Sequence, residues 1–548
     1  MRKYSSWILL FCLVSANLLA HWFFFRIDLT DDKRYSLGEE TKTLLRNAGR
    51  VEVDLFLDGK LNSGFLRLKN AAVQMLREFD AYGDVSLSVC NPVRMTETEQ
   101  QSLTEELARY GYIPTAVYER DRSGKTSETI VYPYARLRCG GNSMILCLLQ
   151  NNRGLSGAEN LNHSMESLEY LFAESIESLS SSERTKIAFL EGHGELGERA
   201  TMDVQRMVSS CFDIYRGTLT SEVGCLNPFK VVVIADPQLP FTEQDKYILD
   251  QYIMQGGRVL WALNGVRLSE DVLSKNGFTP ILPMELNVQD MLFRYGVRVN
   301  PRLVADLQCL SVPVDVSPNP AQPQYEPIPW CYAPLLLTSS ESPITHNLMQ
   351  LSSAFVSDID FVGDSTAQKR VVLLATSNAS RLVGTPAEID LADLTINPQA
   401  FTKAYIPVAV SLEGKFSSLF AHRMMPQGLI TDTVKLNETA YSKQVIVASG
   451  TVFQNDWQNN QPLPCGYDRY SKMQFGNRDF FLNALFWLAD DTGLINLRQK
   501  TIPLRLLNTT LVNEKKNIYT VYALGLPLTF LALTAVAVFL LRRMRYEH

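Results

Sequence analysis

The sequence contains few of the residues that build metal and redox sites. Its 548 residues include six histidines and nine cysteines. No two cysteines form a CxxC pair, and no cysteine–histidine cluster has the spacing of a zinc site. Charged residues make up 20% and the formal net charge is -6, so the basic stripe of a nucleic-acid-binding protein is missing. The composition therefore predicts no metal, no cofactor and no nucleic-acid partner.

Motifs for nucleotide binding and for nucleophilic catalysis are also missing. Gly124-Lys125-Thr126 has the end of a phosphate-binding loop, but Glu119 occupies the position of the first glycine and an extended run follows. No GxSxG or GxCxG sequence is present to supply a nucleophile on a strand-to-helix turn. The sequence thus predicts neither an ATPase nor a hydrolase of that type.

Long apolar runs are confined to the two ends, and the first covers residues 7–25. As a helix, about nineteen residues would span ~28 Å, close to the hydrocarbon thickness of a bilayer. The alternative is a cleaved signal peptide, with Val14-Ser15-Ala16 as a weak cleavage site. Cleavage there would shorten the apolar core to about seven residues. We therefore expect an uncleaved membrane anchor.

The second apolar run covers residues 521–541 and ends in Arg542, Arg543 and Arg545. Positive residues beside a membrane helix favour the cytoplasmic side. With an anchor at each end, both termini are predicted in the cytoplasm of a Gram-negative cell. The intervening chain is then predicted in the periplasm, tethered at both ends to the inner membrane.

Residues 27–180 alternate strand and helix patterns. Val51–Leu57 alternates apolar and polar residues, and Phe65–Tyr82 carries the apolar stripe of a helix packed on a sheet. Extended runs and a helix over Met165–Leu179 follow, which predicts a thioredoxin-like α/β domain. Asp58-Gly59-Lys60 stands where the redox cysteines would lie, so no disulfide chemistry is expected.

Four further side chains receive structural interpretations. Cys139 and Cys147 are not opposite each other in the predicted hairpin and are interpreted as buried residues, although an oxidising compartment would permit a disulfide. His163 and His346 are predicted at the surface or at helix ends.

Residues 184–500 predict a second α/β domain. The continuous apolar run Phe229–Ala235 suits a strand covered on both faces. A helix capped by Thr242 and ending near Gln255 follows, and Arg258–Leu263 is the next strand. This crossover predicts a flavodoxin- or amidotransferase-like parallel sheet.

The second domain is expected to carry a large insertion at about residues 300–440. Its Pro-rich stretch Pro313–Pro334 is interpreted as a long irregular excursion. The overall prediction is thus two α/β domains flanked by one transmembrane helix at each terminus.

The most site-like motif is Gly192-His193-Gly194-Glu195, directly after a predicted strand. Ligands bind at strand carboxyl ends in open α/β sheets, and a histidine with a glutamate can do acid–base chemistry. The alternative is a glycine-bounded turn whose polar side chains cap a helix. We interpret these four residues as a candidate ligand or partner contact, with no catalytic residue assigned.

Several long phrases resemble a known family, among them RIDLTDDKRYSLGEETKTLL, KIAFLEGHGELGE and DPQLPFTEQDKYILDQYIMQGGRVLW. Together they resemble the auxiliary, substrate-binding-type subunits of ABC transporters, in particular the gliding-motility-associated GldG group of Bacteroidetes. The resemblance runs in order from Arg26 to the C-terminus. It implies an accessory subunit that works with a separate ATPase and a separate permease in gliding motility or surface export.

The sequence therefore predicts a non-enzymatic auxiliary subunit whose partners are an ABC permease, an ATPase, the inner membrane and other periplasmic envelope proteins. A double tether favours a coupling role over capture and delivery of a solute. The alternatives are a hydrolase or amidotransferase-like enzyme, or a solute receptor, built on the second domain.

Overall fold

The computed structural model describes residues 36–109, 112, 114–120, 126–150, 156–180, 184–209, 211–315, 317, 324–363, 366–391, 397–432, 434–499 and 515–546. The chain forms two compact units, Met1–Thr501 and Ile502–His548. Within the first unit we describe a first α/β part up to residue 180 and a second α/β part from residue 184. The predicted anchor at residues 7–25 lies outside the described residues.

The first α/β part contains a four-stranded sheet of order β2-β1-β5-β6. Strands β1 and β2 are parallel, whereas β5 is antiparallel to both β1 and β6. This order agrees with the predicted thioredoxin-like layout, and the assignment to that class stays a prediction. The elements are α2 (Glu39–Asn47), β1 (Val51–Leu55), α3 (Ser63–Asp80), β2 (Val85–Val89), η1 (Pro92–Arg94), α4 (Glu97–Arg109), β3 (Thr115–Arg120), β4 (Thr126–Val131), β5 (Tyr134–Cys139), β6 (Asn142–Cys147), α5 (Gly157–Glu166) and α6 (Leu168–Ser180).

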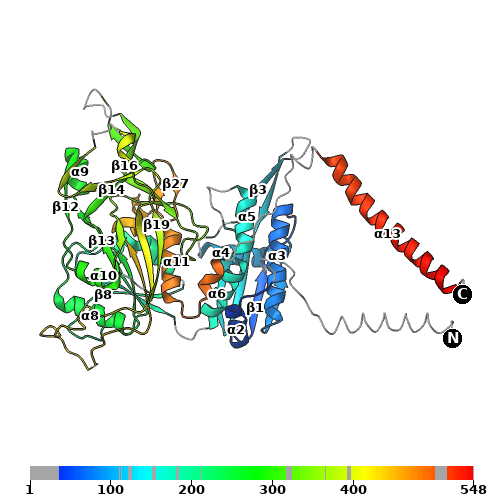
Figure 1. Ribbon diagram of the computed structural model, residues 1–548, viewed down its shortest axis with the longest axis horizontal. Helices are drawn as coiled ribbons and strands as arrows, with labels where there is room; N and C mark the ends of the chain where they lie inside the picture. Colours follow the sequence, from blue (N-terminus) through cyan, green and yellow to red (C-terminus); the bar gives the residue numbers. More distant parts are fainter. Residues whose placement is uncertain are drawn as a thin grey trace. The chain divides into compact units, whose positions relative to one another are not determined.

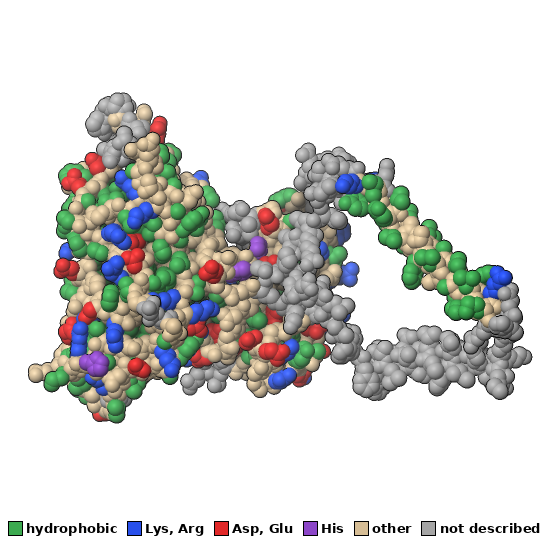
Figure 2. Space-filling view, viewed as in Figure 1, with side chains coloured by type: hydrophobic (Ala, Val, Ile, Leu, Met, Phe, Trp, Pro, Cys, Tyr) green, Lys and Arg blue, Asp and Glu red, His purple; other side chains and the backbone are tan. Residues whose placement is uncertain are grey.

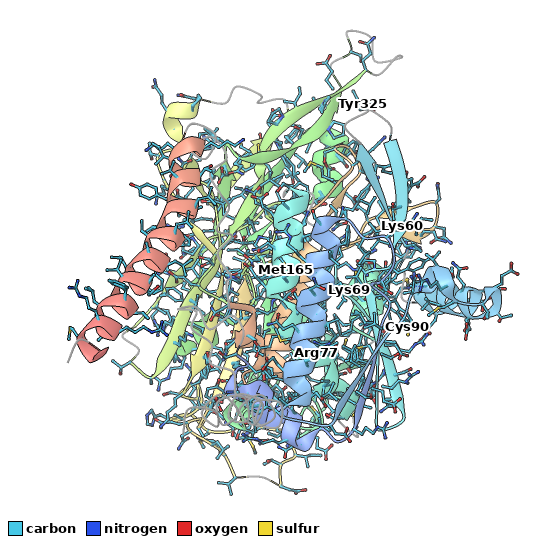
Figure 3. The ribbon with its side chains drawn as sticks, turned by 90° about the vertical axis from the view of Figure 1, so that its right-hand side faces the viewer. Lys60, Lys69, Arg77, Cys90, Met165 and Tyr325 are labelled. Atoms are coloured by element: carbon cyan, nitrogen blue, oxygen red, sulfur yellow. The ribbon has the colours of Figure 1, made fainter. Side chains whose placement is uncertain are left out.

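Helices cover both faces of this sheet. Alternate residues of β1 pack with the buried stripe of α3 and with α6, while Leu103 and Leu107 of α4 pack on the opposite face. Helix α3 begins at Asn62, whose side chain accepts from the Phe65 N–H at 2.9 Å. Figure 3 shows α3, which carries the labelled Lys69, beside α5, and the two helices are in contact.

The second α/β part is built on a ten-stranded mixed sheet. Its order is β15-β16-β19-β22-β23-β10-β9-β7-β8, with β17 paired to β16. Figure 1 labels β16, β19 and β8 of this sheet. The five strands at one end of this order, from β23 to β8, are parallel to one another. The remaining strands extend the sheet in antiparallel pairs. The strands of this sheet are β7 (Lys186–Glu191), β8 (Asp213–Thr218), β9 (Val231–Ala235), β10 (Arg258–Ala262), β15 (Cys309–Asp315), β16 (Tyr325–Thr338), β17 (Leu351–Ser352), β19 (Gln368–Ala375), β22 (Pro407–Gly414) and β23 (Ser442–Val447).

Two hydrophobic cores lie on the two faces of the parallel strands. One face packs against α7 and α11, and the other packs against α8 and α10. The strands β9 and β10 are buried at every position, as expected for strands covered on both sides. The helical segments of this part are η2 (Glu198–Thr201), α7 (Met202–Val208), α8 (Glu243–Met254), α9 (Glu270–Asn276), α10 (Gln289–Tyr295), η3 (Pro398–Ala400), η4 (Thr451–Phe453), α11 (Asn477–Ala489) and η5 (Leu494–Gln499).

The crossover from β9 through α8 to β10 confirms the predicted parallel unit. Thr242 and Asp245 form a reciprocal capping box at the start of α8. The helix ends before Gln255, and Gly256 takes a φ of 92° that suits glycine. Strands β9 and β10 are neighbours and parallel.

Within the Pro-rich stretch Pro313–Pro334, the described residues 313–315 and 325–334 lie in strands, so the prediction of an irregular excursion is wrong for them. Strands β15 and β16 form an antiparallel pair, with Pro313 opposite Pro327. The reason is that β15 is an edge strand and this end of β16 pairs with β15 alone, so proline costs no inner ladder bond. The region predicted as an insertion at about 300–440 supplies β15, β16, β19 and β22 to the main sheet. The predicted domain limits themselves stay predictions.

The remaining strands form small sheets beside the main one. They are β11 (Val266–Arg267), β12 (Phe278–Pro283), β13 (Val297–Val299), β14 (Arg302–Asp306), β18 (Ile359–Phe361), β20 (Ser380–Gly384), β21 (Ala387–Asp390), β24 (Trp457–Gln458), β25 (Gln461–Pro462), β26 (Tyr467–Asp468) and β27 (Met473–Gln474). One further prediction needs correction, because the single helix expected over Met165–Leu179 is two helices. They break at Ser167, which caps the end of α5.

The second unit contains helix α13 (Lys516–Tyr546). Within it, Ile518–Met544 is long and apolar enough to cross a membrane, with a mean hydropathy of 2.4. Figure 2 shows hydrophobic side chains along the helix and Lys and Arg near its ends. The apolar run predicted at residues 521–541 is therefore a helix of suitable length.

Candidate functional site

The motif Gly192-His193-Gly194-Glu195 lies at the point where the strand order of the main sheet reverses. The chain leaves β7 toward the outer strand β8 and then returns to β9 on the other side of β7. Crevices at such points, beside the carboxyl ends of the strands, are where open α/β sheets bind ligands. The structure thus places the four predicted residues at the expected position for a site.

The backbone of this motif is fixed by two glycines and by hydrogen bonds to a neighbouring segment. Gly192 and Gly194 take backbone φ angles of 115° and 76°, which residues other than glycine rarely adopt. The His193 carbonyl accepts from the N–H groups of Gln238 and Leu239 at 2.7 and 2.8 Å. These bonds tie the end of β7 to the segment that follows β9.

The His193 ring is held on three sides. Its Nδ1 lies 3.2 Å from Oε1 of Glu195, and its Nε2 lies 3.2 Å from Oδ2 of Asp245. The ring stacks on Phe241, with centroids 3.8 Å apart and an interplanar angle of 15°. The second Glu195 oxygen accepts from the His193 backbone N–H at 2.7 Å. We call His193, Glu195, Asp245 and Phe241 the histidine clasp.

The electrostatics of the clasp keep the histidine protonated. Burial by itself would lower the pKa of His193, but the hydrogen bonds and charges of Asp245 and Glu195 outweigh it and raise the pKa to about 9. The same contact helps to lower the pKa of Asp245 against the effect of its own burial. At neutral pH both ring nitrogens therefore carry protons, and neither has a lone pair with which to act as a base.

A second polar group lies beside the clasp at the ends of β9, β10 and β23. Asp236 follows β9 with a φ of 55°, and its Oδ1 accepts from the Asn264 amide at 2.6 Å. The Asn264 side-chain oxygen accepts in turn from the Gly450 N–H at 2.8 Å. Burial, with a smaller contribution from Glu270, raises the pKa of Asp236 to about 7. These three residues join the ends of three parallel strands.

Sequence reasoning missed Asp236, Asn264 and Asp245 as members of this region. The Asp236-Pro237 step was visible only as the end of a strand, and Asp245 only as a helix-capping residue. The one signal was positional, because each residue follows or faces the carboxyl end of a parallel strand. Contact between them depends on strand order, which a single sequence does not contain.

Other candidate residues are not brought to this site. Gly124 and Lys125 lie outside the described residues, and Thr126 begins strand β4 rather than a helix, as predicted. His163 lies in the last turn of α5, 3.0 Å from Glu166. His346 was expected at the surface or a helix end, but it lies in a turn and is 7% exposed. Its Nδ1 lies 3.3 Å from the Ser340 carbonyl oxygen, which gives the buried ring a polar partner.

The described residues offer no group of three or more His, Cys, Asp or Glu side chains placed to hold a metal ion. Cys139 is buried and Cys147 half-buried, and both are free thiols. In the hairpin, Cys147 lies opposite Tyr134 and Cys139 opposite Asn142, as the predicted pairing requires.

Comparison with known proteins identifies two families along the chain. Residues 31–138 match a domain of unknown function, DUF7088. No curated protein matches the chain. Among solved structures, the mmIFT52 N-terminal domain matches with 16% identity and a TM-score of 0.33, covering 56% of this chain and 99% of that one. Residues 184–484, more than half of the chain, match the ABC transporter auxiliary family described as an ABC-type uncharacterized transport system, and the protein belongs to that family.

Proposed function

We propose that the protein is a non-enzymatic, membrane-anchored auxiliary subunit of an ABC transporter complex, working with a separate permease and a separate ATPase. The observation that carries the proposal is family membership together with an apolar helix, α13, of membrane-spanning length. A nucleotide-binding motif is missing from the sequence, so the energy of transport has to come from another subunit.

In the proposed arrangement both termini are cytoplasmic and the two α/β parts are periplasmic. The clustered Arg542, Arg543 and Arg545 after the apolar span support a cytoplasmic C-terminus. The resemblance to the gliding-motility-associated group of Bacteroidetes supports a role in gliding motility or surface export. Contacts with other periplasmic envelope proteins would be made by the α/β parts.

The contacts of His193 in the histidine clasp argue against the enzyme alternative. A hydrolase or amidotransferase would need His193 as a base, yet its ring nitrogens face Glu195 and Asp245. The solute-receptor alternative is favoured by one separate feature, a cavity described in the next subsection.

The proposal is tested by purifying the tagged full-length protein from its native host in mild detergent. Mass spectrometry should recover one ABC permease and one ABC ATPase in fixed ratio to the bait. A matched variant replaces residues 518–541 with an unrelated apolar helix of equal length, which preserves anchoring. Loss of the permease from that variant would assign partner binding to α13, and failure of the unaltered protein to recover either subunit would refute the proposal.

Topology is tested separately with C-terminal reporter fusions. Green fluorescent protein fused after His548 should fluoresce, whereas alkaline phosphatase fused there should be inactive. The reverse pattern would overturn the proposed orientation while leaving the partner experiment intact.

A further inference from the structure

A cavity of about 290 Å³ lies where the first α/β part meets the second. Helix α6 forms one wall, the segment from the end of α11 into η5 forms a second, and the residues just before β7 and β8 form a third. The volume is enough for several water molecules or for one small organic molecule. Its lining residues are Tyr170, Glu174, Glu177, Ser178, Arg184, Thr185, Cys211, Phe212, Phe486, Ala489, Asp490, Asp491, Thr492, Leu494 and Ile495.

Most of the acidic side chains in this wall already have partners. Asp490 accepts from the backbone N–H groups that open η5, including Gly493 at 2.7 Å and Ile495 at 3.1 Å. Asp491 pairs with Lys230 and Arg258. These two carboxylates therefore stabilise the fold, and most of their oxygen atoms are already engaged by protein donors rather than available to a ligand.

Glu174 differs from them because its Oε1 is buried and, among the described residues, receives no ion pair and no backbone N–H. The Tyr170 hydroxyl, one helical turn earlier on α6, is buried beside it; burial raises the pKa of Glu174, and the interaction with this hydroxyl works against that rise. The Arg498 guanidinium acts on Glu174 through its charge, but it donates to Asn483 and lies over the Tyr170 ring at 5.4 Å. A carboxylate left in this state costs free energy unless it is protonated or receives a donor.

Three aromatic side chains contribute to the lining of the cavity. Tyr170 contributes one ring, and Phe212 and Phe486 form a tilted pair with centroids 5.1 Å apart. Aromatic faces attract organic cations, and aromatic rings together with a carboxylate are the chemistry that recognises alkylammonium groups. We propose that this cavity binds a small organic cation of the alkylammonium class, with Glu174 as its carboxylate acceptor and Tyr170, Phe212 and Phe486 as its aromatic walls.

Cation binding in this cavity should depend on pH, because Glu174 has to be ionised to attract the cation. Burial raises the pKa of Glu174 to about 7, and the nearby Tyr170 hydroxyl and Arg498 act in the opposite direction. Burial also raises the pKa of Glu177. A bound cation requires the ionised carboxylate, so binding at pH 7 should release about half a proton. The titratable or charged groups that surround Glu174 are Tyr170, Glu177, Arg184, Cys211, Asp490, Asp491 and Arg498.

The test uses the full-length protein in detergent and two probes of nearly equal shape. Choline carries a quaternary ammonium, and 3,3-dimethyl-1-butanol is its neutral isostere. Isothermal titration calorimetry in two buffers of different ionisation enthalpy measures both the affinity and the proton release. Choline should bind about tenfold more tightly at pH 8 than at pH 6, because the ionised fraction of Glu174 rises by about that factor. The neutral isostere should bind at least tenfold more weakly.

Glu174→Gln keeps the shape of the side chain and removes its charge. It should weaken choline binding at least tenfold and abolish the proton release, with an unchanged or higher melting temperature. Phe486→Leu should weaken choline without affecting the neutral isostere, because it removes a ring but keeps apolar volume. Glu198→Gln is the matched control, since Glu198 begins η2 and does not line the cavity.

Three results would overturn the proposal. The first is equal binding of choline and its isostere, which would indicate an apolar pocket only. The second is full affinity in Glu174→Gln. The third is no binding of choline or tetramethylammonium at millimolar concentration, which would mean that the cavity holds water alone. None of these results bears on whether the permease and ATPase are partners, so the two proposals fail separately.

Discussion

The histidine clasp should act as a pH-dependent fastener between β7 and α8, and replacing His193 by glutamine tests this directly. The raised pKa, about 9 against an ordinary 6.5, corresponds to about 3 kcal/mol of preference for the protonated ring in the folded protein. The ring is 10% exposed and the Glu195 side chain 1%, so solvent screens this interaction little. Glutamine keeps a polar side chain but cannot carry the charge that both carboxylates need.

The sign of the pH dependence follows from the direction of the pKa change. A pKa raised on folding contributes stability that is complete below pH 6.5 and is lost as the pH rises through about 9. The histidine contribution should therefore fall from about 3 kcal/mol at pH 6 to about 1 kcal/mol at pH 8.5. The lowered pKa of Asp245 acts on the acid side, where its contribution is lost as the pH falls through that pKa.

Hydrogen exchange measured by mass spectrometry is the suitable assay, because it reports local opening in a chain of more than one domain. Peptides over residues 190–197 and 236–247 should exchange about 100-fold faster in His193→Gln than in the unaltered protein at pH 6, after correction for intrinsic rates. At pH 8.5 the difference should shrink to about fivefold.

The control is His163→Gln, since His163 pairs with Glu166 on α5 and makes no contact with the clasp. It should leave exchange over residues 190–197 unchanged. An equal difference at both pH values would refute the electrostatic reasoning, because loss of stacking on Phe241 has no pH dependence. No difference at either pH would refute the clasp itself.

Two further substitutions test how the second α/β part is held together, each by urea unfolding followed through tryptophan fluorescence. In Gly450→Ala, the new Cβ would lie 2.0 Å from Oδ1 of Asp236, so we expect a loss of about 1–3 kcal/mol. Gly217→Ala is its control, because a Cβ there meets nothing within 4 Å, and it should lie within about 0.5 kcal/mol of the parent. Asp250→Ala removes a fully buried carboxylate that accepts from Tyr295 Oη and Ser418 Oγ, and it should cost about 2–4 kcal/mol. A change under 0.5 kcal/mol in Gly450→Ala or Asp250→Ala would contradict the packing described.

The parts of the fold that sequence reasoning predicted share one property, which is that their signals are local. The unit from β9 to β10 is an apolar run, a capping box and a glycine stop, all within residues 229–263. Each signal acts on neighbours in the chain, so a single sequence contains it in full.

The errors arose where the outcome depended on distant partners. Pro313 and Pro327 suggest irregular chain locally, but as an edge hairpin they cost no inner ladder bond. The break between α5 and α6 is a different, local error: it falls at Ser167, in a stretch whose apolar spacing also suits one continuous helix. The Pro-rich stretch was misjudged because strand order decides which backbone groups need partners.

The candidate site also combines a local signal, which the sequence contains, with contacts to distant residues, which it does not reveal. Its motif after β7 was visible, but its meaning depended on Asp245, 52 residues from His193 along the chain. A histidine beside one carboxylate reads as an acid–base pair, whereas a histidine between two carboxylates reads as a fixed cation. Glu174 was equally hidden, because its burial depends on η5, more than 300 residues later.

The double tether depends on the predicted anchor at residues 7–25. The mass and the N-terminal residue of the purified protein test whether this segment is retained. If residues 7–25 form an uncleaved helix, the mature protein purified from the membrane should have the mass of the full chain and an N-terminus at or next to Met1. Cleavage after Ala16 would instead give a new N-terminus at Asn17. The physical argument for retention is that such cleavage leaves only about seven apolar residues before it, which is at the lower limit for a signal-peptide core. The control is a variant with Ala16→Trp, whose bulk blocks cleavage. Masses that differ only by the Ala-to-Trp substitution would support the anchor, and a parent shortened by residues 1–16 would leave α13 as the single tether.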